Sequence, residues 1–288
     1  RILAERYDIV INLDNTKVSS SLASIAEGDR KYGFLLNSRG YVYSTNSAAE
    51  YWLEMSANDM LKRENSKSYQ EIMTSIVDLN GSIDKPIWEV TNKEQESVQN
   101  IRRMLNKKDI TIGLNTGAGK RWPNKNWPLK KWKELINKIG PNKYNLLLLG
   151  GTVERTKNKR IYEKFPYVIH SGCDNSLRKF AAIINLCDII VTADSLALHI
   201  ATALDKYVIA LFGPTSYSEI NLYGKGRKIL PQKKCNCFYN NKCTDEVFCM
   251  STISSTIVYN TINDIIKDFR EENNFVYSYL VNSPLKDK

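Results

Sequence analysis

Three polar side chains stand where a buried strand gives way to a helix. Residues 188–193, D-I-I-V-T-A, have the Ile and Val content of a strand covered on both faces, and Asp194 and Ser195 follow at the position of a helix cap. Ligands of parallel sheets bind beyond the carboxyl ends of the strands, where free helix amides attract an anion such as phosphate. His199, one turn after Ser195, leans back toward the same place; its alternative role is that of a core histidine satisfied by a neighbour. The stretch predicts an anion site around Asp194, Ser195 and Leu196.

Two more polar loops follow predicted strands earlier in the chain. The strand 109–115 runs into T-G-A-G-K-R-W-P-N-K, in which Gly117 permits close approach of the backbone to a ligand and Lys125 adds positive charge. The strand 144–149 ends in G-G-T-V-E, so the Glu154 carboxylate can accept hydrogen bonds from a ribose or a base; its alternative role is that of a first-turn helix glutamate. Because parallel strands end at one edge of a sheet, the three loops together predict a nucleoside diphosphate site.

Four of the six cysteines are clustered as C-x-C-x5-C-x5-C. In a chain without a secretion-signal layout, such a cluster is typical of a metal site or a redox-active thiol group as well as of disulfides. The spacing lacks the two-residue separation of the usual zinc-ligand pairs, so the three alternatives stay open. The clustered residues are Cys235, Cys237, Cys243 and Cys249. The other two, Cys173 and Cys187, lie in or beside apolar segments and are expected to be small buried hydrophobes.

Composition and charge narrow the class of protein. The 288 residues are 42% hydrophobic and 25% charged, as in globular proteins with a substantial core, and no run of eighteen apolar residues exists. The net charge of +10 favours an anionic partner: nucleic acid, a phosphorylated sugar donor or an anionic membrane surface, unless the lysines serve only solubility. The lysines are spread along the chain and no nucleic-acid motif is present, so we expect no nucleic-acid partner.

The first half of the sequence predicts an α/β domain. Residues 7–13 form an apolar strand, and a helix follows with Asp14 or Asn15 near its cap. Asp14 and Lys17 are polar groups at the carboxyl end of that strand and could line a cleft, although helix capping is the simpler interpretation. Through residues 47–78 apolar side chains repeat at helical spacing, and we expect them in the core.

The pattern restarts after a polar, extended segment at residues 83–91, which is the best domain boundary. A charged helix is expected next, and strands and helices then alternate through the second half as in the βαβ units of a parallel sheet. The expected elements are strands at 109–115, 144–149, 165–171, 188–193 and 207–212, and helices beginning near residues 128, 176 and 195.

Four segments of the second half carry a family resemblance. They read N-T-G-A-G-K-R-W-P-N-K-N-W-P, L-L-L-L-G-G-T-V-E, S-L-R-K-F-A-A-I-I-N-L-C-D-I-I-V-T-A-D-S-L-A-L-H-I-A-T-A-L and V-I-A-L-F-G-P-T. Together they resemble glycosyltransferase family 9, the ADP-heptose:lipopolysaccharide heptosyltransferases. The resemblance implies donor contacts at Thr116, Gly117, Lys125, Glu154, Asp194, Ser195, Leu196 and His199. Leu196 stands where the family has glycine, so we expect the backbone to approach the diphosphate less closely there.

The same resemblance implies a GT-B architecture. The expected fold class is α/β, with two Rossmann-like domains whose parallel sheets face a cleft, and we expect the N-terminal one to be truncated. The chain starts without an initiator methionine or signal peptide, and we expect a fragment entered within a domain. The expected parts are 1–91, a partial acceptor-side domain; 92–108, a linker and helix; 109–262, the nucleotide-sugar-binding domain; and 263–288, a C-terminal helix that packs back on the N-terminal domain.

The activity implied by the resemblance is inverting, metal-independent transfer of a sugar, heptose in the best-known members, from a nucleoside diphosphate to a lipopolysaccharide-core or other glycan acceptor. No cofactor is required, and a structural metal at the cysteine cluster stays an open alternative. The family's catalytic aspartate lies in a segment without a counterpart after Arg1, which leaves Asp14 and Lys17 as the remaining candidates on the acceptor side.

The expected place of action is the cytoplasm, in peripheral contact with the inner membrane face, which the positive charge favours. Two alternative functions are a protein O-glycosyltransferase of the same family and a nucleotide-sugar-binding module without turnover. An α/β oxidoreductase is disfavoured because the glycines form no G-x-G-x-x-G, and G-A-G-K lacks the spacing of a P-loop.

Overall fold

A computed structural model describes residues 5–79, 81, 83–106, 110–141, 143–240 and 242–282. They form two compact units, residues 1–84 with 216–221 and residues 85–215 with 222–288, and each is described by itself. Asp109 of the predicted strand, linker residues 107 and 108, and the end of the predicted C-terminal helix at 283–288 lie outside the described residues.

The first unit is a small α/β layer structure. Its three-stranded sheet has the order β1-β2-β3, with β1 parallel and β3 antiparallel to β2. The strands are β1 (Arg6–Asn12), β2 (Glu27–Leu36) and β3 (Val42–Ser44), and the helices are α1 (Lys17–Ile25), α2 (Ser47–Ala57), α3 (Asp59–Glu64) and α4 (Tyr69–Ile76). Phe34 of β2 packs with Met55 of α2 and Ile72 of α4 in the core, so the predicted stripes of residues 47–78 are buried at these positions. The first stripe is only partly buried at Trp52, and Tyr69 of the second is 43% exposed.

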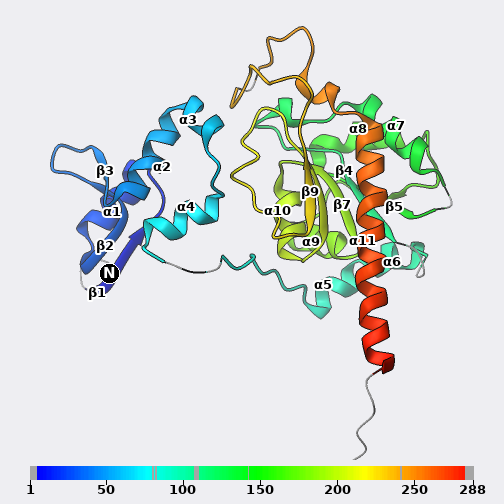
Figure 1. Cartoon of the computed structure of the whole chain (residues 1–288), viewed down its shortest axis with the longest axis horizontal. Helices are drawn as coiled ribbons and strands as arrows, with labels where there is room; N and C mark the ends of the chain where they lie inside the picture. The colour runs from blue at the N-terminus through cyan, green and yellow to red at the C-terminus, as the bar shows by residue number, and fades with distance from the viewer. Residues whose placement is uncertain are drawn as a thin grey trace, which may run out of the picture. The chain divides into compact units, whose positions relative to one another are not determined.

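The second unit contains a six-stranded, all-parallel sheet of order β6-β5-β4-β7-β8-β9 (Figure 1). All residues of β4, β5, β7 and β8 are buried, as their runs of Ile, Leu and Val predict for a sheet covered on both faces. The strands are β4 (Thr111–Asn115), β5 (Asn145–Leu149), β6 (Ile169–His170), β7 (Ile189–Ala193), β8 (Tyr207–Leu211) and β9 (Gly226–Ile229).

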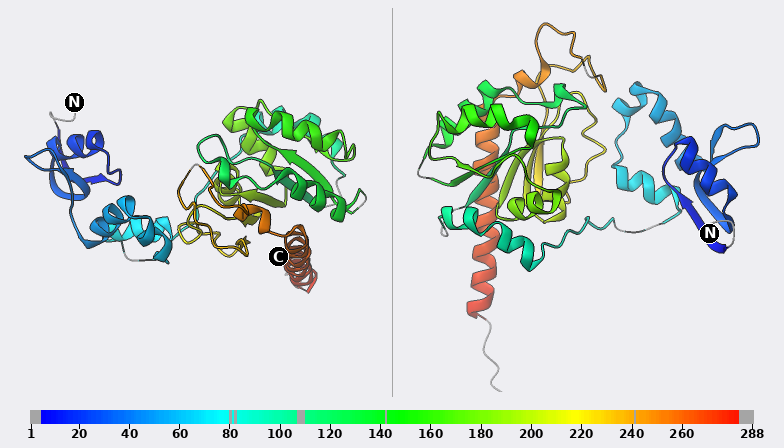
Figure 2. Two further views of the ribbon diagram at one scale, coloured as in Figure 1. Left: turned by 90° about the horizontal axis from the view of Figure 1, so that it is seen from above. Right: turned by 180° about the vertical axis from the view of Figure 1, so that it is seen from behind.

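Helices cover both faces of this sheet (Figure 2). One face carries α7 and α11, whose apolar residues share a core with alternate residues of the strands, such as Ile112 and Val191. The helices α9 and α10 pack together, and α10 lies against β7 and β8. The helices are α5 (Asn92–Ser97), α6 (Gln99–Met104), α7 (Leu129–Ile139), α8 (Arg155–Tyr162), α9 (Leu177–Asn185), α10 (Leu196–Ala203) and α11 (Ser255–Asn282), with 3₁₀ turns η2 (Pro123–Lys125), η3 (Thr152–Glu154) and η4 (Cys249–Thr252).

Three local differences from the sequence-based expectation have physical reasons. The cap of α1 is Thr16, whose hydroxyl accepts from the Ser19 amide, while Asp14 accepts from Thr16. The predicted strand at 165–171 is reduced to β6, because this strand pairs only with β5 at the edge of the sheet. The charged helix after residue 91 breaks at Val98 into α5 and α6.

None of the helices in the described part of the chain combines the length and hydropathy needed to cross a bilayer.

Candidate functional site

The polar loops that follow β4, β5 and β7 meet at the carboxyl edge of the six-stranded sheet. We use carboxyl edge for the end of the sheet at which the parallel strands have their carboxyl ends. Together with the start of α9 the three loops line a pocket of about 420 Å³ there. This is the position at which parallel α/β sheets bind ligands, since helix amino termini and loop amides converge there. Its lining includes Asn115, Gly117, Glu154, Asn175 and Ser195.

A partly buried ion pair stands at this edge of the sheet. Lys125 Nζ lies 2.7 Å from Asp194 Oδ2, and the two side chains are only 13% and 14% exposed. The Thr215 hydroxyl, from the loop after β8, donates to the same carboxylate oxygen at 2.8 Å. Lys125, from η2, and Asp194, from the loop after β7, are thus held together although 69 residues separate them. The cation is fixed beside the amino terminus of α10, where a phosphate would bind.

The amino terminus of α10 has no side-chain cap. Ser195 occupies the N-cap position, yet its side chain makes no hydrogen bond to the helix. Its hydroxyl lies 2.9 Å from Thr192 Oγ1 and accepts from Asn115 Nδ2 at 3.2 Å. The Leu198 amide donates to the Ser195 carbonyl at 3.0 Å, so among the described residues only the two amides that precede it in α10 are available to an anion. Asn115, a buried residue that the sequence did not single out, holds Ser195 in this position.

Gly117 leaves room for a carboxylate. A Cβ atom at this residue would lie 2.3 Å from Glu154 Oε1, closer than any real contact. Glu154 is buried, and its Oε2 accepts from the Gly151 amide at 2.9 Å. The space that Gly117 leaves is thus taken by the Glu154 carboxylate, and close approach of the Gly117 backbone to a ligand stays a prediction. The bond to Gly151 is the first-turn contact named as the alternative role of Glu154, which also lines the pocket; a contact with a ligand stays a prediction.

Lys157 is a second cation beside this loop, and the sequence did not indicate it. Its Nζ donates to the Thr116 carbonyl at 2.6 Å and to Asn126 Oδ1 at 3.3 Å. Burial lowers the pKa of Lys157, and the nearby Glu154 carboxylate opposes that shift. The available signal was its place one turn after Glu154 on the following helix. Thr116 is further fixed through its hydroxyl, which donates to Asn158 Oδ1 at 2.5 Å.

Leu196 and His199 occupy the exposed stripe of an otherwise buried helix. Leu196 is 57% exposed and lines the pocket, whereas Ala197, Leu198 and Ile200 are buried. His199 is exposed, so its alternative role as a core histidine is wrong. A contact between His199 and a ligand stays a prediction.

The four clustered cysteines lie together behind the donor-side loops. All six cysteines are free; the sulfurs of Cys235 and Cys237 are 3.3 Å apart, and Cys249 is fully buried against Met250 and Gly213. Burial raises the pKa of the Cys237 thiol to about 12, helped by hydrogen bonds with neighbouring thiols. In the part of the chain that the structure describes, no three His, Cys, Asp or Glu side chains are arranged to hold a metal ion. The geometry therefore gives the metal alternative no support. As predicted, Cys173 and Cys187 are buried.

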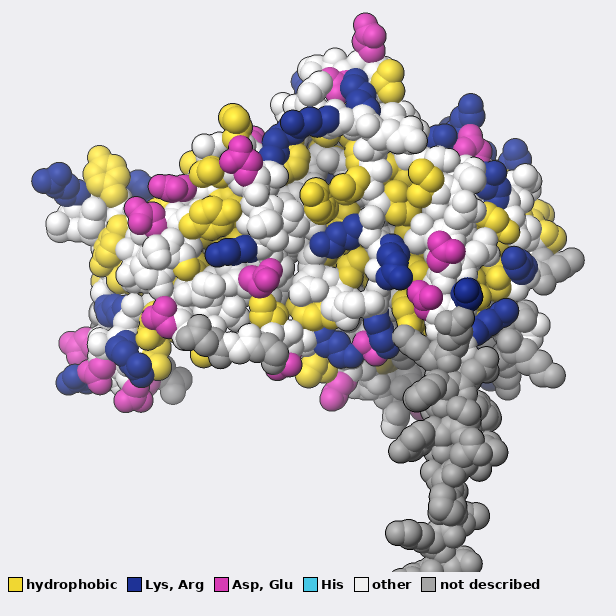
Figure 3. Space-filling model, in the orientation of Figure 1, with side chains coloured by type: hydrophobic (Ala, Val, Ile, Leu, Met, Phe, Trp, Pro, Cys, Tyr) yellow, Lys and Arg dark blue, Asp and Glu magenta, His cyan; other side chains and the backbone are white. Residues whose placement is uncertain are grey.

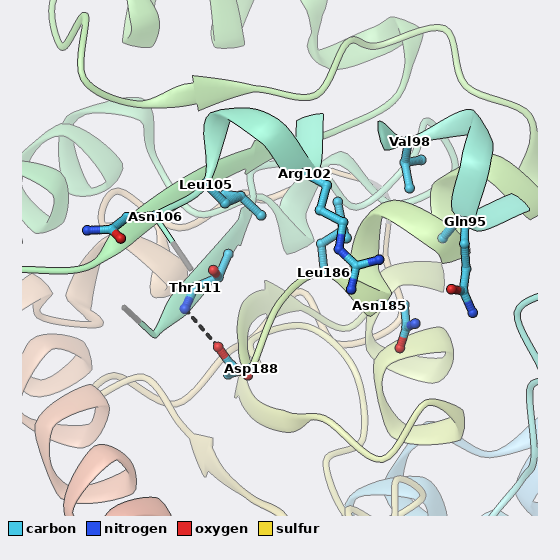
Figure 4. A pocket seen from close by; sticks show the side chains of 10 residues that line it. Gln95, Val98, Arg102, Leu105, Asn106, Thr111, Asn185, Leu186 and Asp188 are labelled. Atoms are coloured by element: carbon cyan, nitrogen blue, oxygen red, sulfur yellow. Dashed lines mark hydrogen bonds between the residues drawn. The ribbon is translucent and has the colours of Figure 1, made fainter. Parts of the chain in front are cut away.

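A second pocket, of about 530 Å³, lies at the opposite edge of the same sheet (Figure 4). It is lined by the helices α5, α6 and α9 and by the residues that enter β4 and β7. Asp188 accepts there from the Thr111 amide at 2.8 Å, and the Arg102 guanidinium lies in the same pocket. None of the predicted site residues lines this pocket, so it offers control positions for binding experiments.

The acceptor-side candidates of the first unit have structural roles. The Asp14 carboxylate accepts from both the amide and the hydroxyl of Thr16, each at 3.1 Å, and Lys17 is the first residue of α1. Asp14 thus holds the cap residue Thr16 and does not itself cap α1, so the expected capping by Asp14 is wrong. A part of Asp14 or Lys17 in acceptor binding or catalysis stays a prediction. On the face shown in Figure 3, Lys and Arg side chains are scattered among acidic and apolar ones.

A parallel α/β sheet with a cationic, amide-rich site at its carboxyl edge defines a nucleotide-binding class of protein. Residues 1–248 match glycosyltransferase family 9 (heptosyltransferase), and the chain belongs to this family. The chain is 27% identical over 237 residues to lipooligosaccharide heptosyltransferase 2 of Haemophilus influenzae, covering 74% of this chain and 62% of that protein. It thus spans less than two thirds of the length of that relative.

Two solved structures show the fold. The E. coli ADP-heptose lps heptosyltransferase II matches with a TM-score of 0.61 at 20% identity, over 91% of this chain and 77% of that one. The glycosyl transferase family 9 protein from Veillonella parvula matches with a TM-score of 0.70 at 18% identity, over 92% and 75%. The predicted α/β, GT-B-like fold is confirmed by these likenesses.

Proposed function

We propose that the chain is the donor-binding part of a glycosyltransferase that moves a sugar from a nucleoside diphosphate to a glycan acceptor with inversion. The observation that carries the proposal is the pairing of Lys125 with Asp194 beside the uncapped amino terminus of α10. A partly buried cation and free helix amides at one point suit the diphosphate, and the neighbouring pocket with Glu154 suits the nucleoside. Family membership supports the same reaction class.

Each residue has a distinct part in the proposed reaction. The acceptor hydroxyl attacks the anomeric carbon, the bond from that carbon to the diphosphate oxygen breaks, and the leaving diphosphate gains negative charge. Lys125 and the first amides of α10 stabilise this charge because they are already oriented before the reaction. Thr116 shapes the phosphate-binding loop. Glu154 accepts a hydrogen bond from the ribose, and Asp194 accepts hydrogen bonds from hydroxyl groups of the transferred sugar. A general base must remove the acceptor proton; Asp14 and Lys17 are predictions for that side.

The finer substrate assignment follows the names of the relatives. The relatives are named for heptose transfer and one for ADP-heptose, so we propose ADP-heptose as the donor and a lipopolysaccharide-core glycan as the acceptor. We further propose that the protein works in the cytoplasm at the anionic inner membrane face, which a net charge of +10 favours. No metal or other cofactor is part of the proposed reaction.

The test is donor binding followed by turnover. The chain is titrated with ADP and ADP-heptose by calorimetry, and product formation is then assayed in the full-length protein with a heptose-deficient lipopolysaccharide. Binding with release of ADP supports the proposal. Binding without turnover favours a nucleotide-sugar-binding module, transfer only to protein favours an O-glycosyltransferase, and absence of any nucleotide binding contradicts the transferase assignment.

A further inference from the structure

The pocket at the carboxyl edge has an apolar side, which the binding of a diphosphate does not require. Val153 and Leu177 are each 49% exposed, although both are large apolar residues. Both line this one pocket, together with the half-buried ring of Phe180. Exposed apolar groups in a pocket of this size suit a flat ring, such as a nucleobase, which buries its faces and keeps its edge for hydrogen bonds.

One polar side chain of the lining has its donors committed. Asn175 lies in the loop between β6 and α9, and its Nδ2 donates to the carbonyls of Ser171 at 3.2 Å and Gly172 at 3.3 Å. An amide nitrogen has two hydrogens, so both are used, and the two carbonyls fix which end of the amide is nitrogen. The Asn175 Oδ1, which accepts no hydrogen bond from the described residues, is the atom left for a ligand.

The acceptors that orient Asn175 are themselves anchored to the sheet. The amide and hydroxyl of Ser171 both donate to the Leu148 carbonyl of β5, and the Gly172 amide donates to His170 Nδ1 at 3.2 Å. Burial lowers the pKa of His170, which keeps the ring neutral and able to accept this bond. Turning the Asn175 amide over would place its oxygen against two carbonyl oxygens. Asn175 therefore presents a fixed acceptor.

We propose that Asn175 selects a nucleobase that carries an exocyclic amine, adenine or cytosine, over one with a carbonyl at the same position. This rests on the proposed function, since it assumes that the donor nucleoside occupies this pocket. The amine of adenine or cytosine donates to Oδ1, whereas the carbonyl oxygen of hypoxanthine or uracil would face it acceptor to acceptor. A site built around a fixed acceptor rejects a ligand that cannot donate to it.

Matched nucleotide pairs test this directly. ADP and IDP differ in the group at position 6, an amine or a carbonyl, and in the adjacent ring nitrogen, which is an acceptor in adenine and an N–H in hypoxanthine. CDP and UDP differ in the same way at positions 4 and 3. We expect the chain to bind the amine-bearing member of the better-bound pair at least about tenfold more tightly by calorimetry. In Asn175→Ala the affinities for the two members of the pair should differ by no more than about twofold.

Asn185→Ala is the control, because Asn185 lies in the pocket at the opposite edge of the sheet and should leave the ratio unchanged. Equal binding of ADP and IDP, and of CDP and UDP, by the unaltered chain overturns the inference and leaves the proposed function standing. A ratio that persists in folded Asn175→Ala, checked by circular dichroism, overturns the role of Asn175. If no nucleotide binds, the proposed function fails together with this inference.

Discussion

Removing the positive charge of Lys125 should destabilise the second unit. Lys125 Nζ and Asp194 Oδ2 are 2.7 Å apart, which corresponds to about 6 kcal/mol of direct attraction at an effective dielectric constant of 20. Desolvation of both groups offsets much of that energy. Breaking a fully buried pair costs about 3–5 kcal/mol and breaking an exposed one at most about 1 kcal/mol. At 13% and 14% exposure we expect Lys125→Met to lower the free energy of unfolding by about 2 kcal/mol.

Urea unfolding followed by tryptophan fluorescence measures the free energy of unfolding of the second structural unit. Four of the five tryptophans lie in the second unit, and Trp127 and Trp132 are buried with ring centroids 5.0 Å apart. A loss of about 2 kcal/mol should lower the urea midpoint by about 1 M. Lys159→Met, which breaks an exposed pair with Glu163, is the matched control and should cost less than about 0.5 kcal/mol.

A double-mutant cycle decides whether the pair itself is responsible. Lys125→Met and Asp194→Asn are each measured alone and together. A real ion pair should give a coupling of at least about 1 kcal/mol, because the second substitution has less left to remove. If the two losses simply add, or if Lys125→Met costs no more than the Lys159 control, the pair is not the stabilising contact that we describe.

Three further outcomes test other parts of the site. Gly117→Ala places a methyl group against the Glu154 carboxylate, so we expect at least tenfold weaker ADP binding by calorimetry; unchanged affinity would mean that the carboxylate moves aside freely. Leu196→Gly should tighten ADP binding by restoring close backbone approach, and equal or weaker affinity would count against obstruction by leucine. With its pKa raised to about 12, Cys237 should react with iodoacetamide at pH 8 about a thousandfold more slowly in the native chain than in urea, gaining about tenfold per pH unit; equal rates by peptide mass spectrometry would contradict its burial.

The sequence predicted the second unit well because its signals are local. Runs such as residues 145–149 and 189–193 are apolar throughout, which is typical of strands buried on both faces, and glycine, proline and serine mark the helix ends between them. Gly140, for example, was expected to end α7 and does so at a φ of +76°. The loops predicted to form the site meet because the carboxyl ends of parallel strands lie at the same end of the sheet.

The residues that were missed depend on contacts distant in sequence. Asn115 reaches Ser195 across 80 residues, Lys157 reaches the Thr116 carbonyl across 41, and Thr215 reaches Asp194 across 21. Each is an ordinary polar residue within or beside a regular element, so no periodicity or motif distinguishes it. Its part in the site follows only from which strands become neighbours in the sheet. For this reason the network that holds the site was not visible in the sequence.

The most direct test of the central claim is a calorimetric titration of ADP into the unaltered chain, Lys125→Ala and Arg102→Ala. Arg102 belongs to the pocket at the opposite edge of the sheet, so its removal is a matched loss of one positive charge. We predict saturable one-to-one binding that Lys125→Ala weakens by roughly tenfold or more, as for a charge-assisted hydrogen bond, and that Arg102→Ala leaves within about twofold. Absence of binding, or binding that is lost in Arg102→Ala and kept in Lys125→Ala, would contradict a donor site at the carboxyl edge.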